Sequence, residues 1–168
     1  MIRIREDIQA GLAKDPATRS ALELFLTSPG LHAIWMHHVG HKLWSWGWRI
    51  PARMFSGWSR FLTGIEIHPG AVIGRRVVID HGMGVVIGET AIVGDDVLMY
   101  HGVTLGGKVN ARVKRHPTIG NNVLLGAGSK IIGDIEIGDG AMVGANAVVT
   151  KSVPAGAVIV GSENKPIN

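Results

Sequence analysis

The stretch IGNNVLLGAGSKIIGDIEIGDGAMVGANAVV, from Ile119 to Val149, decides the fold of this chain of 168 residues. A large aliphatic residue recurs there at every sixth position: Ile119, Leu125, Ile131, Ile137, Val143 and Val149. Glycine follows most of them directly, and a small or β-branched residue stands four positions after each of the first five. This hexapeptide repeat is typical of a parallel β-helix.

Two earlier runs keep the same period, and their members are Ile67, Ile73 and Ile79, then Ile87, Val93, Met99 and Leu105. Each hexad predicts a short strand and a corner, and three hexads make one triangular coil of about 18 residues. The large aliphatic residue points inward and stacks on its copy one coil later, while glycine permits the corner. We therefore expect a left-handed parallel β-helix over residues 65–161, with about four coils.

The repeat is interrupted twice. Between Ile79 and Ile87 the next aliphatic residue comes two positions late, and Asp80 and His81 lie in the interruption. Between Leu105 and Ile119 the segment GGKVNARVKRHP loses the period, which predicts an extruded loop at residues 106–118. Loops on repeat scaffolds are often tolerated insertions. Histidine and charge in both interruptions nevertheless favour a functional role.

Residues 1–64 contain all five tryptophans and have helical spacing. One helix face is predicted to carry Ile2, Ile4, Ile8 and Leu12. Asp15-Pro16 should end that helix, Ser28-Pro29 should start a second, and residues 49–62 should form a third. We expect an N-terminal α-helical segment at 1–64 and a short tail at 162–168.

Composition excludes several classes of protein. The net charge of +4 suits an anionic small molecule, and the scattered basic residues make nucleic acid a poor partner. The absence of cysteine excludes a disulfide framework and a thiol nucleophile. No apolar run is long enough to span a membrane, and no secretory signal is visible. We expect a cytoplasmic protein that binds no membrane.

The interruption around His81 suggests acid–base chemistry. No P-loop or nucleophile elbow is present. Glu66 precedes His81 by nearly one coil, so its carboxylate is predicted to hold one ring nitrogen and leave the other as a general base. The alternative is a purely structural corner histidine.

Several segments together resemble the serine O-acetyltransferase family. The interrupted corner and the residues that follow it read IDHGMGVVIGETAIVGDDV from Ile79. The segments VTLGG and RHPTIG and the stretch from Leu124 to Val149 come after it. The resemblance extends upstream to REDIQAGLAKDPA and LHAIWMHHVGHKLW, and so covers nearly the whole chain. It implies transfer of the acetyl group of acetyl-CoA to the hydroxyl of L-serine, the first step of cysteine synthesis, without a covalent enzyme intermediate.

The resemblance also implies roles for individual residues. His81 matches the catalytic base, and Glu66 stands where the family often has the aspartate that orients it. Asp80 and Asp15 match residues that meet the amino group of the substrate. Arg115 and His116, which match the pair that binds the substrate carboxylate, complete the implied site.

For acetyl-CoA, the resemblance points to small residues that let the pantetheine arm lie against backbone. These residues are Gly106, Gly107, Ala127, Gly128 and Ala145. Lys130 and Lys151 are either contacts for CoA phosphates or solvated charges. The role of His101 is left open.

Two other functions fit the repeat. A hexapeptide acetyltransferase for a sugar or another hydroxyl acceptor would share the base and acetyl-CoA. A zinc carbonic anhydrase of this fold could use His81 and His116 as ligands, but a third histidine at suitable spacing is missing. His37, His38 and His41 lie in a packing helix, so we expect no metal site.

A prism of this type normally associates by its flat faces. We expect a homotrimer with active sites between subunits. The sequence ends SENKPIN, without the Ile-terminated tail through which the family binds cysteine synthase, and this weakens the expectation of that complex.

Overall fold

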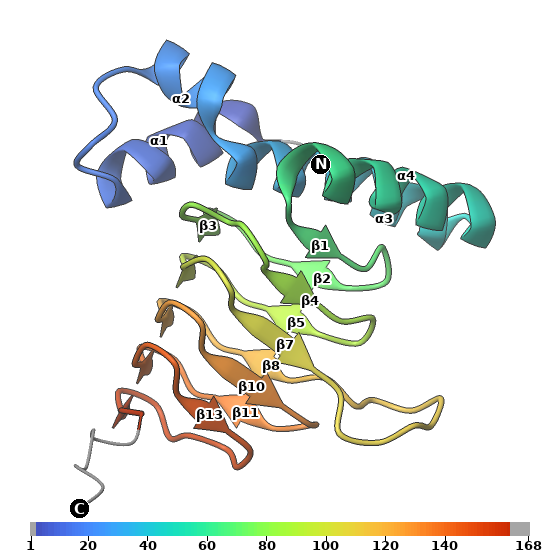
Figure 1. Cartoon of the computed structure of the whole chain (residues 1–168), viewed down its shortest axis with the longest axis vertical. Helices are drawn as coiled ribbons and strands as arrows, with labels where there is room; N and C mark the ends of the chain where they lie inside the picture. The colour runs from blue at the N-terminus through green and yellow to red at the C-terminus, as the bar shows by residue number, and fades with distance from the viewer. Residues whose placement is uncertain (1–2, 162–168) are drawn as a thin grey trace, which may run out of the picture.

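A computed structural model describes residues 3–161 of the chain, where four helices precede fourteen short strands (Figure 1). The helices are α1 (Ile4–Lys14), α2 (Ala21–Thr27), α3 (Pro29–Ser45) and α4 (Arg49–Thr63). The strands are β1 (Glu66–Ile67), β2 (Val72–Ile73), β3 (Val78–Ile79), β4 (Val86–Ile87), β5 (Ile92–Val93), β6 (Leu98–Met99), β7 (Thr104–Gly106), β8 (Thr118–Ile119), β9 (Leu124–Leu125), β10 (Lys130–Ile132), β11 (Glu136–Ile137), β12 (Met142–Val143), β13 (Val148–Val149) and β14 (Val158–Ile159).

The helix boundaries follow local chemistry. Helix α3 starts as predicted, with Pro29 in its first turn and the Ser28 side chain accepting a hydrogen bond from the Leu31 N–H. Helix α1 ends before Asp15-Pro16, and α4 ends where Gly64 takes a left-handed backbone conformation. Ile2 and the tail at 162–168 lie outside the described residues.

The sequence prediction missed α2. This helix has only seven residues and begins at a Ser20 cap that accepts from the Glu23 N–H. Two of its leucines, Leu22 and Leu26, are exposed, so the segment has no apolar stripe long enough for periodicity to detect.

The strands form three parallel sheets, and the chain visits each sheet once per coil. The first sheet has the order β1-β4-β7-β10-β13, the second β11-β8-β5-β2 and the third β14-β12-β9-β6-β3. Ile131 pairs with Val149, one regular coil later. Four complete layers and part of a fifth result, slightly more than the predicted four, because Val153 and β14 continue the coil.

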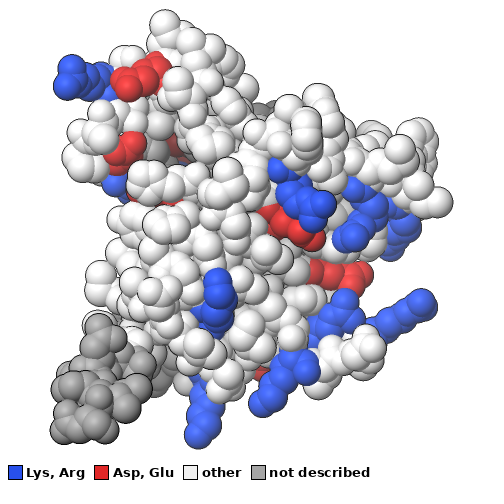
Figure 2. All heavy atoms as spheres, in the orientation of Figure 1, with Lys and Arg blue, Asp and Glu red and all other residues white. Residues whose placement is uncertain are grey.

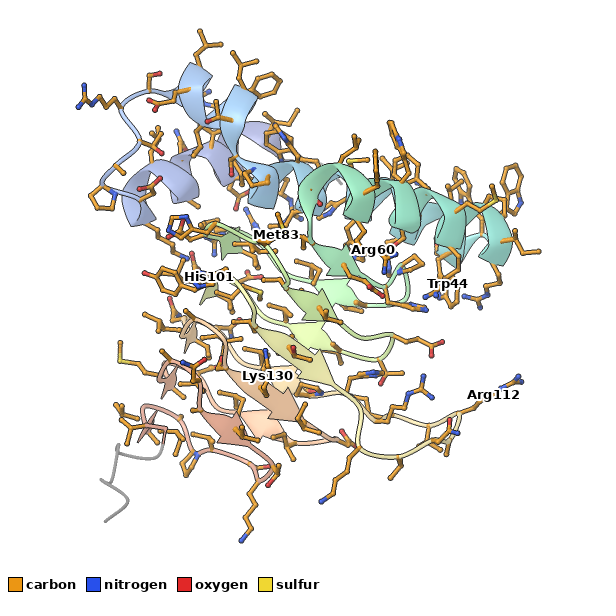
Figure 3. All side chains as sticks on the ribbon, in the orientation of Figure 1. Trp44, Arg60, Met83, His101, Arg112 and Lys130 are labelled. Carbon is orange, nitrogen blue, oxygen red and sulfur yellow. The ribbon has the colours of Figure 1, made fainter. Side chains whose placement is uncertain are left out.

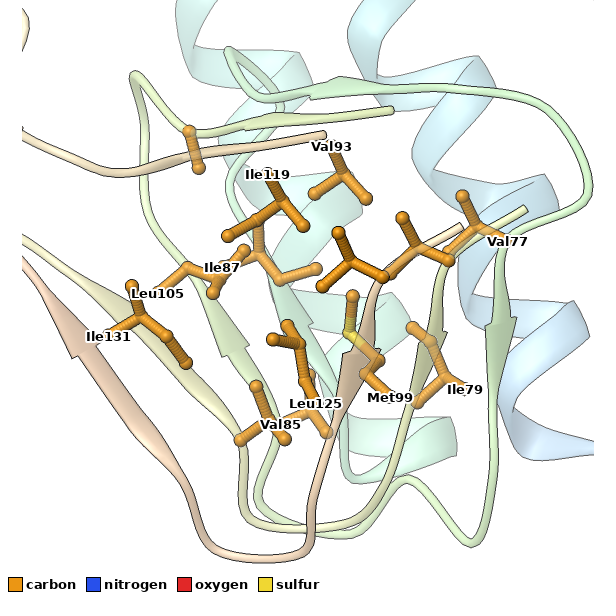
Figure 4. Close-up of a cluster of buried hydrophobic side chains, with 14 of the residues drawn as sticks. Val77, Ile79, Val85, Ile87, Val93, Met99, Leu105, Ile119, Leu125 and Ile131 are labelled. Carbon is orange, nitrogen blue, oxygen red and sulfur yellow. The ribbon is translucent and has the colours of Figure 1, made fainter. Parts of the chain in front are cut away.

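The core is the stack of inward aliphatic side chains (Figure 4). Met99, Leu105, Leu125, Ile131 and Ile137 have no exposed surface. The predicted corner residues are buried too, except Ile135, which is only partly buried. Helices α3 and α4 close one end of this column, with Ala33 and Ile34 joining the core cluster (Figure 1).

Both interruptions are visible as departures from the coil. Ile67 pairs with Ile87, two residues further on than the regular offset, because the corner from Asp80 to Val85 is longer than its copies in other layers. His81 adopts φ 59° there, in the left-handed region. The second interruption is the loop between β7 and β8, which projects from the prism (Figure 1).

Charged groups fasten α1 to the prism. The Arg76 guanidinium donates to both carboxylate oxygens of Asp96, at 2.7 and 2.6 Å, and to Glu6 Oε1 at 2.7 Å. Lys14 Nζ donates to the Asp96 carbonyl at 2.7 Å. Hydrogen bonding from Arg76 holds the pKa of the Asp96 carboxyl below its usual range. Since both ends of α1 are held, the position of Asp15 directly after the helix is set.

No helix within residues 3–161 has the length and apolar character required to cross a bilayer.

The stacked core predicts a large difference between two valine truncations. Val143 is fully buried, and Val109 lies in the projecting loop with 53% of its surface exposed. We expect Val143→Ala to lower the free energy of unfolding by about 2 kcal/mol, since each lost methyl costs roughly 0.8 kcal/mol and leaves a void. Val109→Ala should change it by less than about 0.5 kcal/mol. Urea unfolding monitored by circular dichroism measures both, and equal effects would contradict the inward register.

Candidate active site

One corner of the prism carries the catalytic histidine predicted from the sequence. We call it the histidine corner, and its layers are residues 80–85, 100–103, 126–129 and 144–147. Backbone hydrogen bonds join these layers: the Gly102 N–H donates to the Met83 carbonyl, the Gly128 N–H to the His101 carbonyl, and the Asn146 N–H to the Ala127 carbonyl. The corner is therefore a continuous ladder.

His81 projects from this ladder into solvent. Its side chain is 72% exposed, and its Nε2 lies 3.7 Å from Asp80 Oδ2. The His101 ring, from the next layer, packs edge-on with a centroid distance of 5.8 Å. His101 is therefore an aromatic neighbour of His81.

Helix α1 brings a second carboxylate to the same place. Asp15, Asp80 and His81 line one cavity of about 270 Å³, with Thr18 and Ser28 also on its wall. Thr18 Oγ1 and the Ala17 N–H donate to Asp15, and the Thr18 bond is the main reason that the pKa of Asp15 lies below its usual range. Two carboxylates beside an imidazole suit a ligand that carries an ammonium group and a hydroxyl.

The wall of this cavity depends on a close approach of helix to strand. A Cβ on Gly30, near the start of α3, would lie 2.0 Å from the Ile79 carbonyl oxygen. Glycine is therefore required there to seat α3 against β3, directly before Asp80.

Glu66 does not join this cavity. Its carboxylate forms an ion pair with Arg60, at 2.9 Å, and lines a smaller cavity with Arg53, Ser56 and His68. Within one chain, the structure thus does not support the prediction that Glu66 holds His81. The reason is geometric: Glu66 belongs to the first sheet and pairs with Val86, whereas His81 lies at the corner before that sheet. Spacing along the coil does not show in which direction a side chain points.

Arg115 and His116 lie elsewhere, at the base of the projecting loop. Arg115 Nη2 is 3.1 Å from Glu89 Oε2, and its Nη1 donates to the Ala111 carbonyl at 2.7 Å. His116 is buried, and its burial, together with the Arg115 and Lys114 cations, lowers its pKa. Its Nδ1 lies 2.9 Å from the hydroxyl of Thr90. The sequence pattern did not point to Thr90 as a site residue.

The residues predicted to bind acetyl-CoA divide between these two places. Ala127, Gly128 and Ala145 belong to the histidine corner, whereas Gly106 ends β7 and Gly107 begins the loop. Gly128 adopts φ 71°, and a Cβ there would meet Asn146 Oδ1 at 2.2 Å, so the backbone conformation and the available space both favour glycine. A Cβ on Gly107 would lie 3.3 Å from both Arg115 and His116.

One chain thus presents two half-sites on different sides of the prism. Figure 3 shows His101 on one side and Arg112, from the loop, on the other. Figure 2 shows Lys and Arg side chains gathered on the side where the loop projects. Lys130 donates to the Gly102 carbonyl and is held against the prism, while Lys151 is exposed.

The remaining histidines are packed into the helical layer. His37 is buried, which lowers its pKa to about 3, and His41 Nδ1 bonds to the Pro69 carbonyl at 2.9 Å. His68 packs edge-on against Trp44, and burial lowers its pKa to about 4. Within residues 3–161, no three His, Cys, Asp or Glu side chains converge as metal ligands would.

Comparisons with known proteins identify the family of this chain. The family model described as bacterial transferase hexapeptide (six repeats) matches residues 116–151. A serine acetyltransferase of Mycobacterium tuberculosis is 56% identical over 158 residues, which are 94% of this chain and 69% of that protein. A serine acetyltransferase of Staphylococcus epidermidis is 56% identical over 159 residues, covering 95% of this chain and 75% of that protein.

Solved structures give the same result. Serine acetyltransferase isoform 3 of Entamoeba histolytica, in complex with cysteine, superposes with a TM-score of 0.93 at 39% identity, covering 98% of this chain and 59% of that one. The Neisseria gonorrhoeae enzyme in complex with serine superposes with a TM-score of 0.90 at 37% sequence identity, covering 97% of this chain and 67% of that one. The Brucella abortus enzyme in complex with coenzyme A superposes with a TM-score of 0.92 at 40% sequence identity, covering 95% of this chain and 64% of that one.

The chain therefore spans less than two thirds of the Entamoeba and Brucella structures that it matches. The predicted left-handed parallel β-helix is confirmed by the hexapeptide family match and by these structures. With more than half of its residues identical over more than two thirds of its curated relatives, this chain belongs to the serine acetyltransferase family.

Proposed function

We propose that this protein is a serine O-acetyltransferase, which converts L-serine and acetyl-CoA into O-acetyl-L-serine and CoA. The observation that carries the proposal is the cavity in which His81 meets two carboxylates, Asp15 and Asp80. The names of the relatives, and the serine and coenzyme A in two matched structures, support the same substrates. We place this reaction in the cytoplasm, as the first step of cysteine synthesis.

In the proposed mechanism His81 acts as general base. Its free ring nitrogen takes the proton from the serine hydroxyl while that oxygen attacks the thioester carbon of acetyl-CoA. A tetrahedral oxyanion forms, and a backbone N–H of the corner stabilises it. The carbon–sulfur bond then breaks, and the protonated His81 gives its proton to the leaving thiolate, which yields CoA and restores the base. Because His81 is exposed and unobstructed, it is accessible to the substrate hydroxyl.

The charges of the two half-sites match the two charges of serine. Asp15 and Asp80 bind the ammonium group, and the Arg115 guanidinium with His116 binds the carboxylate. Serine is too short to reach from one side of a prism to another. The two half-sites therefore act together only when neighbouring subunits supply them, which agrees with a homotrimer whose active sites lie between subunits.

The same assembly explains the divided acetyl-CoA residues. Ala127, Gly128 and Ala145 line the histidine corner of one subunit, and Gly106 and Gly107 come from the loop side of its neighbour. Small residues on both walls leave room for the pantetheine arm between the subunits. Glu66 is an orienting partner of His81 only if a neighbouring subunit brings its carboxylate there, since within the chain it pairs with Arg60.

The choice of acceptor tests this proposal against the sugar-acceptor alternative. With acetyl-CoA, L-serine should release CoA thiol at least about 100-fold more efficiently than hexoses, because two charge-assisted contacts each contribute about 1.5–3 kcal/mol. Serine amide, which lacks the carboxylate, should lose about tenfold or more in kcat/KM. A thiol-release assay measures these rates, and a preference for a sugar would refute the proposal.

Removal of the base should affect turnover rather than binding. We expect His81→Ala to lower kcat by about 10²–10⁴-fold, the usual contribution of a general base, while calorimetry shows unchanged binding of acetyl-CoA. His32→Ala is a matched control, because the His32 ring, on α3, contacts the Phe25 carbonyl and Trp35 within the helical layer. A near-normal kcat in His81→Ala would contradict the assignment of His81 as the general base.

Sites shared between subunits should allow complementation. His81→Ala and Arg115→Ala chains, each inactive alone, are denatured together and refolded as mixed trimers. About a quarter of the interfaces should then pair an intact His81 with an intact Arg115, and activity should return to about that fraction of the wild-type value. An inactive mixture with normal trimer content would show that each chain builds its own site.

A further inference from the structure

We propose that Thr90 is the positioning residue of the carboxylate-binding pair, which fixes the proton of His116 on Nε2 and holds the backbone of Arg115 in place. This inference rests on the proposed function, because it assigns a role within the serine site. It is carried by the contacts that join Thr90 to both residues.

Thr90 makes four contacts to the pair. Its hydroxyl oxygen accepts from the Arg115 N–H at 3.0 Å and from the His116 N–H at 3.1 Å. The same hydroxyl lies 2.9 Å from His116 Nδ1, and the Thr90 N–H donates to that nitrogen at 3.2 Å. The Thr90 hydroxyl thus contacts the backbone N–H groups of Arg115 and His116 and also the His116 ring.

These contacts determine the tautomer of His116. A backbone N–H can only donate, so Nδ1 must be an acceptor without a proton. The two amide N–H groups occupy the lone pairs of the Thr90 hydroxyl, and its single proton is left to donate to Nδ1. The neutral His116 ring therefore carries its proton on Nε2.

Two glycines lie beside that nitrogen. A Cβ on Gly88 would lie 2.1 Å from His116 Nε2, and one on Gly107 would lie 3.3 Å from it. Two glycines thus give the ring its room. Burial and neighbouring cations lower the pKa of His116, so the ring stays neutral and presents Nε2–H as a donor for a carboxylate oxygen.

The neighbour of Thr90 completes the arrangement. Glu89 accepts from Arg115 Nη2 at 3.1 Å, which orients the guanidinium beside the imidazole. Consecutive residues Glu89 and Thr90 thus hold consecutive residues Arg115 and His116 across the base of the loop. The segments GETA and RHP, 26 residues apart in the sequence, are therefore in direct contact in the fold.

Thr90→Val tests the role with almost no change in volume. We expect KM for L-serine to rise about 10–100-fold while kcat and KM for acetyl-CoA stay within about twofold, because only binding of the serine carboxylate is affected. Thr90→Ser, which keeps the hydroxyl, should restore KM to within about threefold. An unchanged serine KM in Thr90→Val, an equal loss for both substrates, or failure of Thr90→Ser to restore binding would overturn the assignment.

A spectroscopic readout separates this inference from the proposed function. ¹⁵N NMR of the histidine-labelled wild-type protein, assigned with His116→Gln, should show Nδ1 of His116 as an unprotonated nitrogen and Nε2 as protonated near neutral pH. A proton on Nδ1 would overturn the role of Thr90 even if Thr90→Val did not fold. If L-serine were not acetylated, the proposed function would fail while this tautomer test still decided the structural assignment.

Discussion

The stacking of one aliphatic side chain on its copy in the next coil is the constraint on which the rest of the molecule depends. Each layer contributes short strands of two or three residues, too short to be stable alone, and each gains stability by burying its inward residue against the layers on either side. Because the inward aliphatic residues from Ile67 to Val149 are at most 5% exposed, apart from the partly buried Ile73, a one-residue slip would turn an aliphatic side chain out of the core. The register is therefore strongly determined, and the corners inherit their positions from it.

The residues proposed to carry the function lie where this constraint is relaxed. The two extra residues in the corner after β3 permit Asp80 and His81 to leave the wall without disturbing Ile79 or Ile87, which still stack normally. The projecting loop does the same for Arg115. Rigid layers on both sides hold each irregular segment, so a polar group can be exposed at a defined place at little cost to the core. In addition, the ion pair of Arg76 with Glu6 and the hydrogen bond from Lys14 to the Asp96 carbonyl set α1 over the corner and bring Asp15 to it.

The separation of the two half-sites follows from the same geometry. A closed prism has corners that face away from one another, and side chains at different corners do not share a small ligand. A site for a molecule as small as serine must therefore be completed by another copy of the chain, as proposed above. In the proposed function, oligomerisation is then part of the chemistry.

The sequence by itself determined the coil, its layers and both interruptions, because a period of six with one buried residue per hexad has few other physical solutions. It also located the cavity residues Asp80 and His81, since they stand where the period fails, and resemblance to a family identified Asp15, which periodicity could not. Only the tertiary structure decided that Glu66 pairs with Arg60, that His101 lies against His81, and that the Thr90 hydroxyl contacts His116. The physical reason is that periodicity reports whether a side chain points into the core, whereas the partners of outward side chains depend on contacts between distant layers. The short helix α2 was missed for a related reason, because its order comes from a cap and from packing rather than from a repeated pattern.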